Sequence, residues 1–269
     1  VNLNQYINKF PNGIFIKNAH YFRAESYVAL KRDKEALPDY EYLVKNTPNN
    51  FADEAALRVS DIAFANKDWE KTREYSYIVE KNATTQVMRQ TSMERILLAE
   101  YELKNFDAAA VYAEKVYESE KSSKEVKEYA ALLKARSEME RNNLAEAEIW
   151  WKILQSKNNA NGAEAKVRIY EAMYARAEYA KLEKRILSDV NSLSSYGYWM
   201  GKSFIILGKV YAKLDNFDQS KATLQSVIDN AEDREIIDEA RFELEEVKNL
   251  ELKKNQPVNN DFQFDLNGN

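Results

Sequence analysis

A position usually held by a small residue recurs along the chain at a nearly constant spacing. It lies near the start of the second of two apolar helical stretches in each block, and its residues are Ala36, Thr72, Ala109, Ala147, Leu182 and Ser220. The successive separations are 36, 37, 38, 35 and 38 residues. Self-similarity at a period of roughly 20 to 50 residues is the mark of a repeat architecture. The chain is therefore expected to be an array of like units rather than a closed globule.

The apolar pattern inside each block is helical. Leu207, Val210, Tyr211 and Leu214 are three and four positions apart, which places them on one face of a helix. Glycine and proline are scarce, at 6 and 4 of 269 residues. Turn-rich β-sandwiches, β-barrels and glycine-cradled nucleotide sites need more of both, because their turns require a positive or a restricted φ. Composition and periodicity together predict an all-α fold.

Short polar turns separate the two helices of a block. Asn143 is followed three positions later by Glu146, and Asn216 by Gln219. Such pairs are typical of capping boxes, in which the first side chain accepts a hydrogen bond from an amide at the start of the next helix. We therefore expect these asparagine side chains to cap the second helices.

The blocks resemble the tetratricopeptide repeat (TPR) family, whose helix pairs carry a small residue, an aromatic residue three positions later, an alanine that opens the second helix and a closing proline. The residues that carry the resemblance are Gly208, Tyr211 and Phe217 in the sixth block, and Tyr27, Ala36, Tyr40 and Pro48 in the first. The chain departs from the pattern where Thr72, Leu182 and Ser220 replace the usual alanine. The resemblance implies a right-handed α-solenoid of about six TPR-like helix pairs plus a C-terminal cap helix.

Four segments are expected along the chain. Residues 1–13 resemble the end of a preceding repeat, because the Phe-Pro-Asn turn at Phe10 matches the ending of the first block at Pro48. Residues 14–232 make up the six TPR-like repeats, residues 233–254 a charged amphipathic cap helix, and residues 255–269 a flexible tail. Since a single helix pair cannot bury its apolar stripe alone, each repeat is expected to pack on its neighbours.

No residue pattern indicates catalysis or a cofactor. The chain has no Cys and one His, which rules out a thiol nucleophile and argues against zinc. His20 occupies a position where the TPR family carries a packing residue, so we interpret it as structural. Gly201-Lys202-Ser203 lacks the upstream glycine of a phosphate-binding loop, because Tyr196 stands in its place. We expect a non-enzymatic protein with no cofactor and no metal.

Charge and hydropathy narrow the class of partner. The formal net charge is −5 and no dense run of Lys or Arg is present, so nucleic acid is not an expected partner. No stretch approaches about 18 consecutive apolar residues, so no membrane span is expected. The expected partners are other proteins that dock through a peptide or a helix, and the sequence leaves the oligomeric state open.

In TPR proteins the first helices line the concave face and hold partner peptides, so the resemblance assigns a peptide-binding groove to the matching positions. They are Tyr21, Arg58, Arg95, Leu98, Tyr101, Tyr129, Arg136, Arg168, Tyr174, Lys202 and Lys209. Arg95, Tyr101 and Arg136 are expected to contribute to partner affinity without being required for folding. Trp151 is expected in the core, while its neighbour Trp150 has two interpretations, burial or docking of a partner.

The sequence thus favours a protein–protein interaction scaffold that binds an extended peptide or a helix of a partner in its groove. The turn at Phe10 and a period slightly above about 34 residues resemble the periplasmic repeat domains of outer-membrane-assembly lipoproteins and Tol-Pal-associated proteins. That resemblance implies a bacterial cell-envelope assembly and a periplasmic or outer-membrane-associated location. The alternative is a cytoplasmic peptide-sensing regulator whose output domain is absent from this chain.

Overall fold

The computed structural model describes residues 2–255, in which all regular secondary structure is α-helical. The fourteen helices of these residues are α1 Leu3–Lys9, α2 Ile16–Ala29, α3 Asp33–Lys45, α4 Ala52–Ala65, α5 Trp69–Asn82, α6 Gln86–Glu102, α7 Phe106–Glu118, α8 Lys124–Glu140, α9 Leu144–Leu154, α10 Ala160–Ala175, α11 Tyr179–Leu193, α12 Gly197–Lys213, α13 Phe217–Asn230 and α14 Arg234–Asn255. The prediction of an all-α fold is confirmed. The tail expected from residue 255 lies outside the described residues, apart from Asn255 itself, which ends α14.

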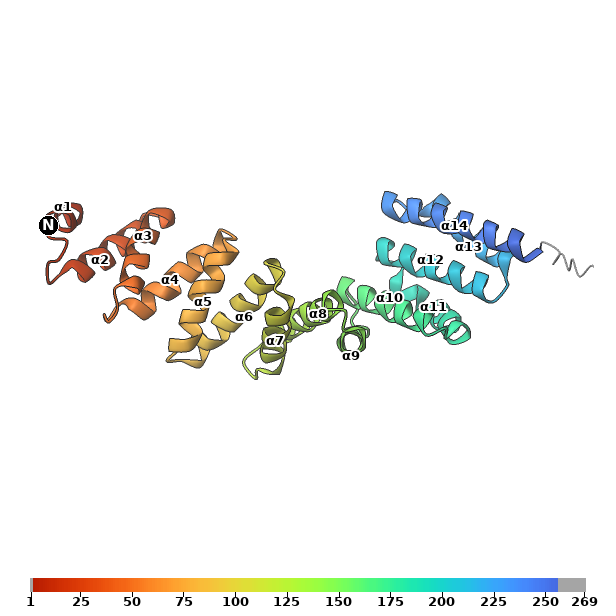
Figure 1. Ribbon diagram of the computed structural model, residues 1–269, viewed down its shortest axis with the longest axis horizontal. Coiled ribbons are helices and arrows are strands. Elements are labelled where there is room, and N and C mark those ends of the chain that lie inside the picture. The colour runs from red at the N-terminus through yellow and green to blue at the C-terminus, as the bar shows by residue number, and fades with distance from the viewer. Residues whose placement is uncertain (1, 256–269) are drawn as a thin grey trace, which may run out of the picture. The chain divides into compact units, whose positions relative to one another are not determined.

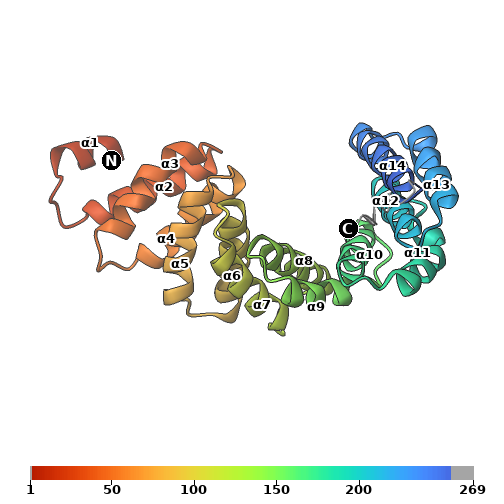
Figure 2. The same cartoon turned by 45° about the vertical axis from the view of Figure 1, so that its right-hand side comes forward.

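The chain divides into two compact units, the first ending at Ile153 and the second beginning at Leu154. In the first unit, helices α1 to α8 pack in sequence order, each against the next (Figures 1 and 2). Lys134 of α8 lies over the ring of Trp150 in α9. In the second unit α10 to α14 also pack in order, and α12 contacts both α10 and α14 in addition.

The repeating element is a pair of antiparallel helices. Six pairs run from α2/α3 to α12/α13, four in the first unit and two in the second. The recurrent position of the sequence lies near the start of every second helix, and its residue is at most 2% exposed in all six pairs. The predicted period and the predicted number of helix pairs are therefore confirmed.

The same backbone turn joins the two helices of every pair, and one residue of this turn has a positive φ. These residues are Lys31, Lys67, Lys104, Asn142, Ala177 and Asp215, with φ between 57° and 64°. At each turn two amides bond back to the helix, as Lys104 N does to Tyr101 O at 3.0 Å and Asn105 N to Glu100 O at 2.8 Å. This pattern is a Schellman motif, which satisfies carbonyl oxygens that a helix end leaves open.

The prediction of a capping box is wrong at Asn216, whose side chain makes no capping hydrogen bond to α13. Its backbone, with φ −88° and ψ 62°, is outside the extended region that a capping residue usually adopts. The side chain of Asn143 is directed backwards instead, and its amide donates to Oε2 of Glu138 at 3.1 Å.

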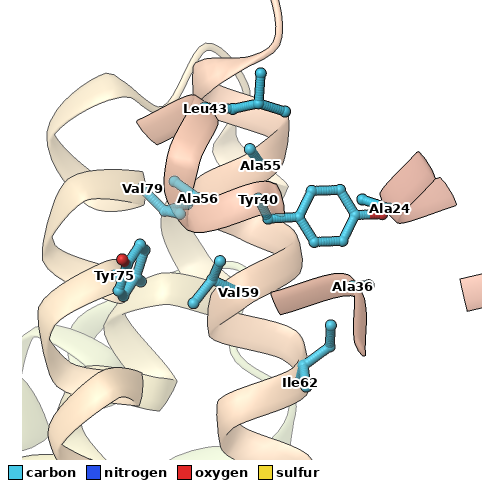
Figure 3. Packing of buried hydrophobic residues seen from close by; sticks show 10 residues of the cluster. All are labelled: Ala24, Ala36, Tyr40, Leu43, Ala55, Ala56, Val59, Ile62, Tyr75 and Val79. Carbon is cyan, nitrogen blue, oxygen red and sulfur yellow. The ribbon is translucent and has the colours of Figure 1, made fainter. Parts of the chain in front are cut away.

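Small residues surround aromatic ones in the core between pairs. Ala24, Ala36 and Ala55 are fully buried in the cluster that holds the Tyr40 side chain, and Figure 3 shows the ring of Tyr40 directed towards Ala24. The Tyr40 hydroxyl donates to Oε1 of Glu25 at 2.5 Å, so its polar end is satisfied. Alanines let the helix backbones approach, and the large ring fills the space that remains.

Two glycines set the close packing of the second unit. A Cβ at Gly208 of α12 would lie 2.7 Å from Cγ of Leu224, which is fully buried on α13. A Cβ at Gly201 would lie 2.5 Å from Cγ2 of Ile236, which is fully buried on α14. A side chain at either position would force Leu224 or Ile236, or the helix that carries it, to shift.

Replacing Lys104 by glycine is expected to stabilise the protein, because a side chain at positive φ costs about 1 kcal/mol that glycine avoids. The midpoint of thermal unfolding should rise by a few degrees. Asn142→Gly is the matched control at the equivalent turn: asparagine tolerates this region better than lysine, so its gain should be smaller. A gain at Asn142 as large as that at Lys104 would contradict this account.

Gly208→Ala is expected to destabilise the second unit, because overpacking against Leu224 costs about 1–3 kcal/mol. The better helix propensity of alanine offsets about 1 kcal/mol of this loss. Gly197→Ala is the control, since a Cβ there meets no atom within 4 Å. The urea concentration at the unfolding midpoint should fall for Gly208→Ala and should not fall for Gly197→Ala. Equal midpoints would show that Leu224 moves aside without loss of stability.

Candidate functional site

The residues predicted to form a groove all lie on first helices. In the first unit Tyr21 is on α2, Arg58 on α4, Arg95, Leu98 and Tyr101 on α6, and Tyr129 and Arg136 on α8; in the second unit Arg168 and Tyr174 are on α10, and Lys202 and Lys209 on α12. We call this side of each unit the first-helix face. Within a unit, many of these side chains contact the first helix of the neighbouring pair.

The first two pairs are linked by a polar cluster around Glu54. The Tyr21 hydroxyl donates to Oε2 of Glu54 at 3.0 Å, and Arg58 lies between Glu25, at 3.5 Å, and Glu54, at 3.6 Å. Burial, the hydrogen bond to Glu54 and the nearby charges of Glu54 and Glu25 raise the pKa of Tyr21 to about 12. The ring of Tyr21 also stacks on Phe51 at 4.4 Å between centroids. Tyr21 and Arg58 therefore link α2 to α4.

Arg95 links α4 to α6. Its Nη1 lies 2.5 Å from Oδ1 of Asp61 and 3.2 Å from Oγ of Ser60, and its guanidinium lies over the ring of Phe64. Only 17% of the Arg95 side chain is exposed. This geometry gives Arg95 a structural role in joining two repeats, so an alanine variant at this position would change stability as well as any binding.

A cleft of about 460 Å³ opens between α6 and α8. Its apolar lining comes from α4, α6, α7 and α8, and consists of Phe64, Leu97, Leu98, Val116, Val126 and Tyr129. Glu94, Arg95, Thr91 and Glu125 supply its polar lining. The cleft brings together three of the predicted groove residues, Arg95, Leu98 and Tyr129. Sequence reasoning missed Phe64, Val116, Val126 and Glu125, because the pairing of α6 with α8 places them there and no local pattern marks them.

Tyr129 is the exposed aromatic residue of this cleft, at 46% exposure. Burial of part of the ring and the charge of Glu102 raise the pKa of its hydroxyl, while Arg136 lowers it, and Tyr101 adds a smaller effect. Tyr101 packs edge-on against Phe106 at 5.8 Å and belongs to the core of the α6/α7 pair. Tyr129 is thus the predicted residue with most area available to another molecule.

In the second unit, the predicted groove lysines contact the last helix of the described chain. Lys202 pairs with Glu239 at 2.5 Å and Glu235 at 3.4 Å, and Lys209 pairs with Glu243 at 2.7 Å. The three glutamates are four residues apart, so they form one stripe along α14. The lysines are therefore used within the chain, and the signal that could have revealed this is the spacing of the acidic residues.

The other two predicted residues of this unit contact neighbours on the same face. Arg168 pairs with Glu171 at 3.0 Å, one turn along α10, and lies over the ring of Trp199. Lys209 lies over the ring of Tyr174, and burial together with Tyr179 and Glu243 raises the pKa of the Tyr174 hydroxyl.

His20 belongs to a buried network, as its interpretation as a structural residue requires. Its Nδ1 lies 2.6 Å from Oδ1 of Asp39, and its ring stacks on Tyr42. Arg23 holds the same carboxylate with two bonds of 2.6 and 2.7 Å. Burial alone would raise the pKa of the Asp39 carboxyl, but the hydrogen bonds from Arg23 and His20 outweigh it and hold the pKa below its usual value.

Both tryptophans of the Trp150-Trp151 pair are buried, at 7% and 2% exposure. Trp151 lies in the core, as predicted. Trp150 packs edge-on against Tyr117 and donates its Nε1 proton to Glu146 at 3.0 Å. The interpretation of Trp150 as a docking residue is therefore wrong, because the ring is already covered by its own unit.

Within residues 2–255, no group of three or more His, Asp or Glu side chains is arranged to hold a metal ion. In the same residues, no helix combines the length and the apolar character needed to cross a bilayer. Gly201, Lys202 and Ser203 lie inside α12, so they form no phosphate-binding loop.

No known family model matches the sequence, and no curated protein matches it either. Among solved structures, the chain is similar to a tetratricopeptide repeat protein from Parabacteroides merdae, with 14% identity, a TM-score of 0.39, and coverage of 91% of this chain and 90% of that one. It is also similar to the TPR domain of P58(IPK), with 10% identity, a TM-score of 0.36, and coverage of 95% and 93%. Both TM-scores are low, so the description of the fold depends on the helix order and packing given above.

The Asp39 network makes stability depend on pH. Because the folded-state pKa of Asp39 is lowered, its contribution is present above the unfolded-state pKa of about 3.9 and is lost as the pH falls through the folded-state value. Asp39→Asn should lower the free energy of unfolding at pH 7 by about 2 kcal/mol, since hydrogen bonds to a charged group are removed. Urea unfolding at pH 7 and pH 2 should show the variant's deficit shrinking in acid. Asp33→Asn, an exposed change on the same helix, serves as control; an undiminished deficit at pH 2 would refute this assignment.

Proposed function

We propose that this chain is a non-enzymatic protein-interaction scaffold of the TPR type, which binds an extended peptide or a helix of a partner protein on its first-helix face. The observation that carries the proposal is the α6/α8 cleft, with its apolar lining, its exposed Tyr129 and its charged rim. Protein interfaces concentrate binding energy in such places, where an aromatic or aliphatic anchor enters an apolar pocket with a polar edge.

The electrostatics of the face support recognition rather than catalysis. Its charges link neighbouring repeats, as Arg95 does with Asp61 and Arg58 with Glu25. The pKa values of the tyrosine hydroxyls on this face are raised further above neutral pH, and that of Tyr21 is about 12. General acid–base catalysis needs the opposite, a group whose pKa lies near the working pH.

The cell-envelope setting is a further part of the proposal, supported by the Phe-Pro-Asn turn at Phe10 and by the repeat period. Fractionation of the native cells, followed by detection of the chain with an antibody, tests it. Recovery in the periplasmic or outer-membrane fraction would support this setting, and recovery in the cytoplasm would overturn it without affecting the scaffold proposal.

Peptides selected from a random display library on the whole chain provide the binding test. We expect Tyr129→Ala to weaken the selected peptides by about tenfold, or about 1.4 kcal/mol, as measured by fluorescence anisotropy. The matched control is Val111→Ala on the second helix α7, where the side chain is 53% exposed. Loss of binding in the Val111 variant alone would place the interface on the second helices, and failure to select any peptide would defeat the proposal.

A further inference from the structure

A second and larger pocket lies in the second unit, away from the α6/α8 cleft. It measures about 840 Å³ and is formed where α12 begins, α13 ends and α14 begins. Met200, Phe204, Val227 and Ile236 supply most of its apolar lining. Its polar lining includes Asn230, Glu232 and Asp233 from the connection between α13 and α14.

Three of the other repeats carry a polar side chain that crosses this end of the helix pair. The position of Gly201, nineteen residues before the recurrent small residue, carries Lys17 in α2, Asp53 in α4 and Gln90 in α6. Each of these side chains reaches across to the end of its second helix or to the connection that follows. Lys17 Nζ donates to Pro48 O at 2.9 Å, and Asp53 accepts from Asn82 Nδ2 at 2.9 Å.

The third pair shows this cross-link in its most buried form. Gln90, only 8% exposed, donates to Ser122 Oγ at 2.8 Å and accepts from Ser119 Oγ at 2.6 Å. Ser119 and Ser122 occupy the positions that Asn230 and Asp233 hold in the sixth pair. The fifth pair has no polar side chain at this position, since Ala163 stands there.

The sixth pair cannot make this cross-link from its own chain. Any side chain at Gly201 would collide with Ile236, whose Cγ2 lies 2.5 Å from the position of a Cβ. The acceptors on the opposite side are nevertheless present, and they are acidic. Glu232 is exposed and makes no hydrogen bond or ion pair within residues 2–255, and Asp233 uses Oδ1 to cap the first amides of α14.

The charge around this pocket is net negative, although one of its carboxylates, Glu235, is paired with Lys202 at 3.4 Å. Residues 229–235 contain four carboxylates and one arginine. The arginine, Arg234, is 94% exposed along its side chain and lies nearest to Asp238, at 3.7 Å. A carboxylate rim over an apolar floor is complementary to a side chain with an aliphatic stem and a cationic head.

We propose that this pocket is a binding site for a lysine or arginine side chain of a partner polypeptide, whose stem packs on Met200 and Phe204 and whose charged head meets Glu232 and Asp233. In the sixth pair, the side chain of the partner would take the place of the cross-link that Lys17 makes within the first pair. This inference is independent of the proposed function of the α6/α8 cleft, because the two sites share no residue.

The test is a methyl-detected NMR titration of the whole chain, following the Met200 ε and Ile236 δ1 methyls. The probe is the peptide acetyl-Ala-Leu-Lys-Leu-Ala-amide, compared with the same peptide carrying norleucine in place of lysine. We expect saturable shifts confined to the pocket methyls and binding at least tenfold tighter for the lysine peptide. Equal affinities, or no saturable shift at these methyls, would overturn the proposal.

Two variants and one small probe complete the design. Glu232→Lys should weaken the lysine peptide at least tenfold while leaving the remaining methyl spectrum unchanged, because Glu232 has no partner to lose among residues 2–255. Glu246→Lys, the same charge change at an exposed residue of α14, should leave the affinity unaltered. An equal loss of affinity in both variants would show that only the net charge of the protein matters, and would contradict a contact with Glu232. Tighter binding of n-butylammonium than of the peptide would assign the pocket to free amines and refute a polypeptide partner.

Discussion

Each helix pair of this chain has an apolar stripe that only an adjacent pair can cover, and this constraint determines the packing within both units. Ala36, Ala109 and Ser220 mark the places where a second helix meets its own first helix without intervening side-chain bulk. The tyrosines and leucines on the far side then bury themselves in the next pair. Since contacts reach no further than near neighbours, stability in such an array is approximately a sum of pair and interface contributions.

The first-helix face has two tasks at once. Its charged residues join neighbouring repeats, as Glu25 and Arg58 do in the first unit and Lys209 and Glu243 do in the second. Its uncharged area, concentrated at Leu98 and Tyr129, lines the cleft that we propose as the binding site. Ion pairs therefore connect neighbouring first helices, and apolar side chains lie between those pairs. A change in a charged residue of this face therefore alters the contacts between neighbouring repeats.

The sequence was sufficient for the helix pairs because their signal is local and repeated: apolar residues lie three and four positions apart, as around Leu207, and one buried position recurs every 35 to 38 residues. It was sufficient for the identity of the first helices, and so for where Tyr129 and Arg95 would lie. It was insufficient for what those side chains contact, because Asp61 meets Arg95 only when two pairs stack. Trp150 shows the same limit, since the ring that covers it, Tyr117, comes from the preceding pair.

The turns that join the two helices of each pair affect how the array unfolds locally. Each turn is made by a residue with a positive φ, and no glycine serves there, so every hairpin retains a small conformational penalty at its tip. In a chain whose pairs respond mainly to their neighbours, such penalties act on one pair at a time. The tendency of individual pairs to open before the whole unit unfolds is thus graded by the identity of six solvent-facing residues, from Lys31 to Asp215, without any alteration to the core.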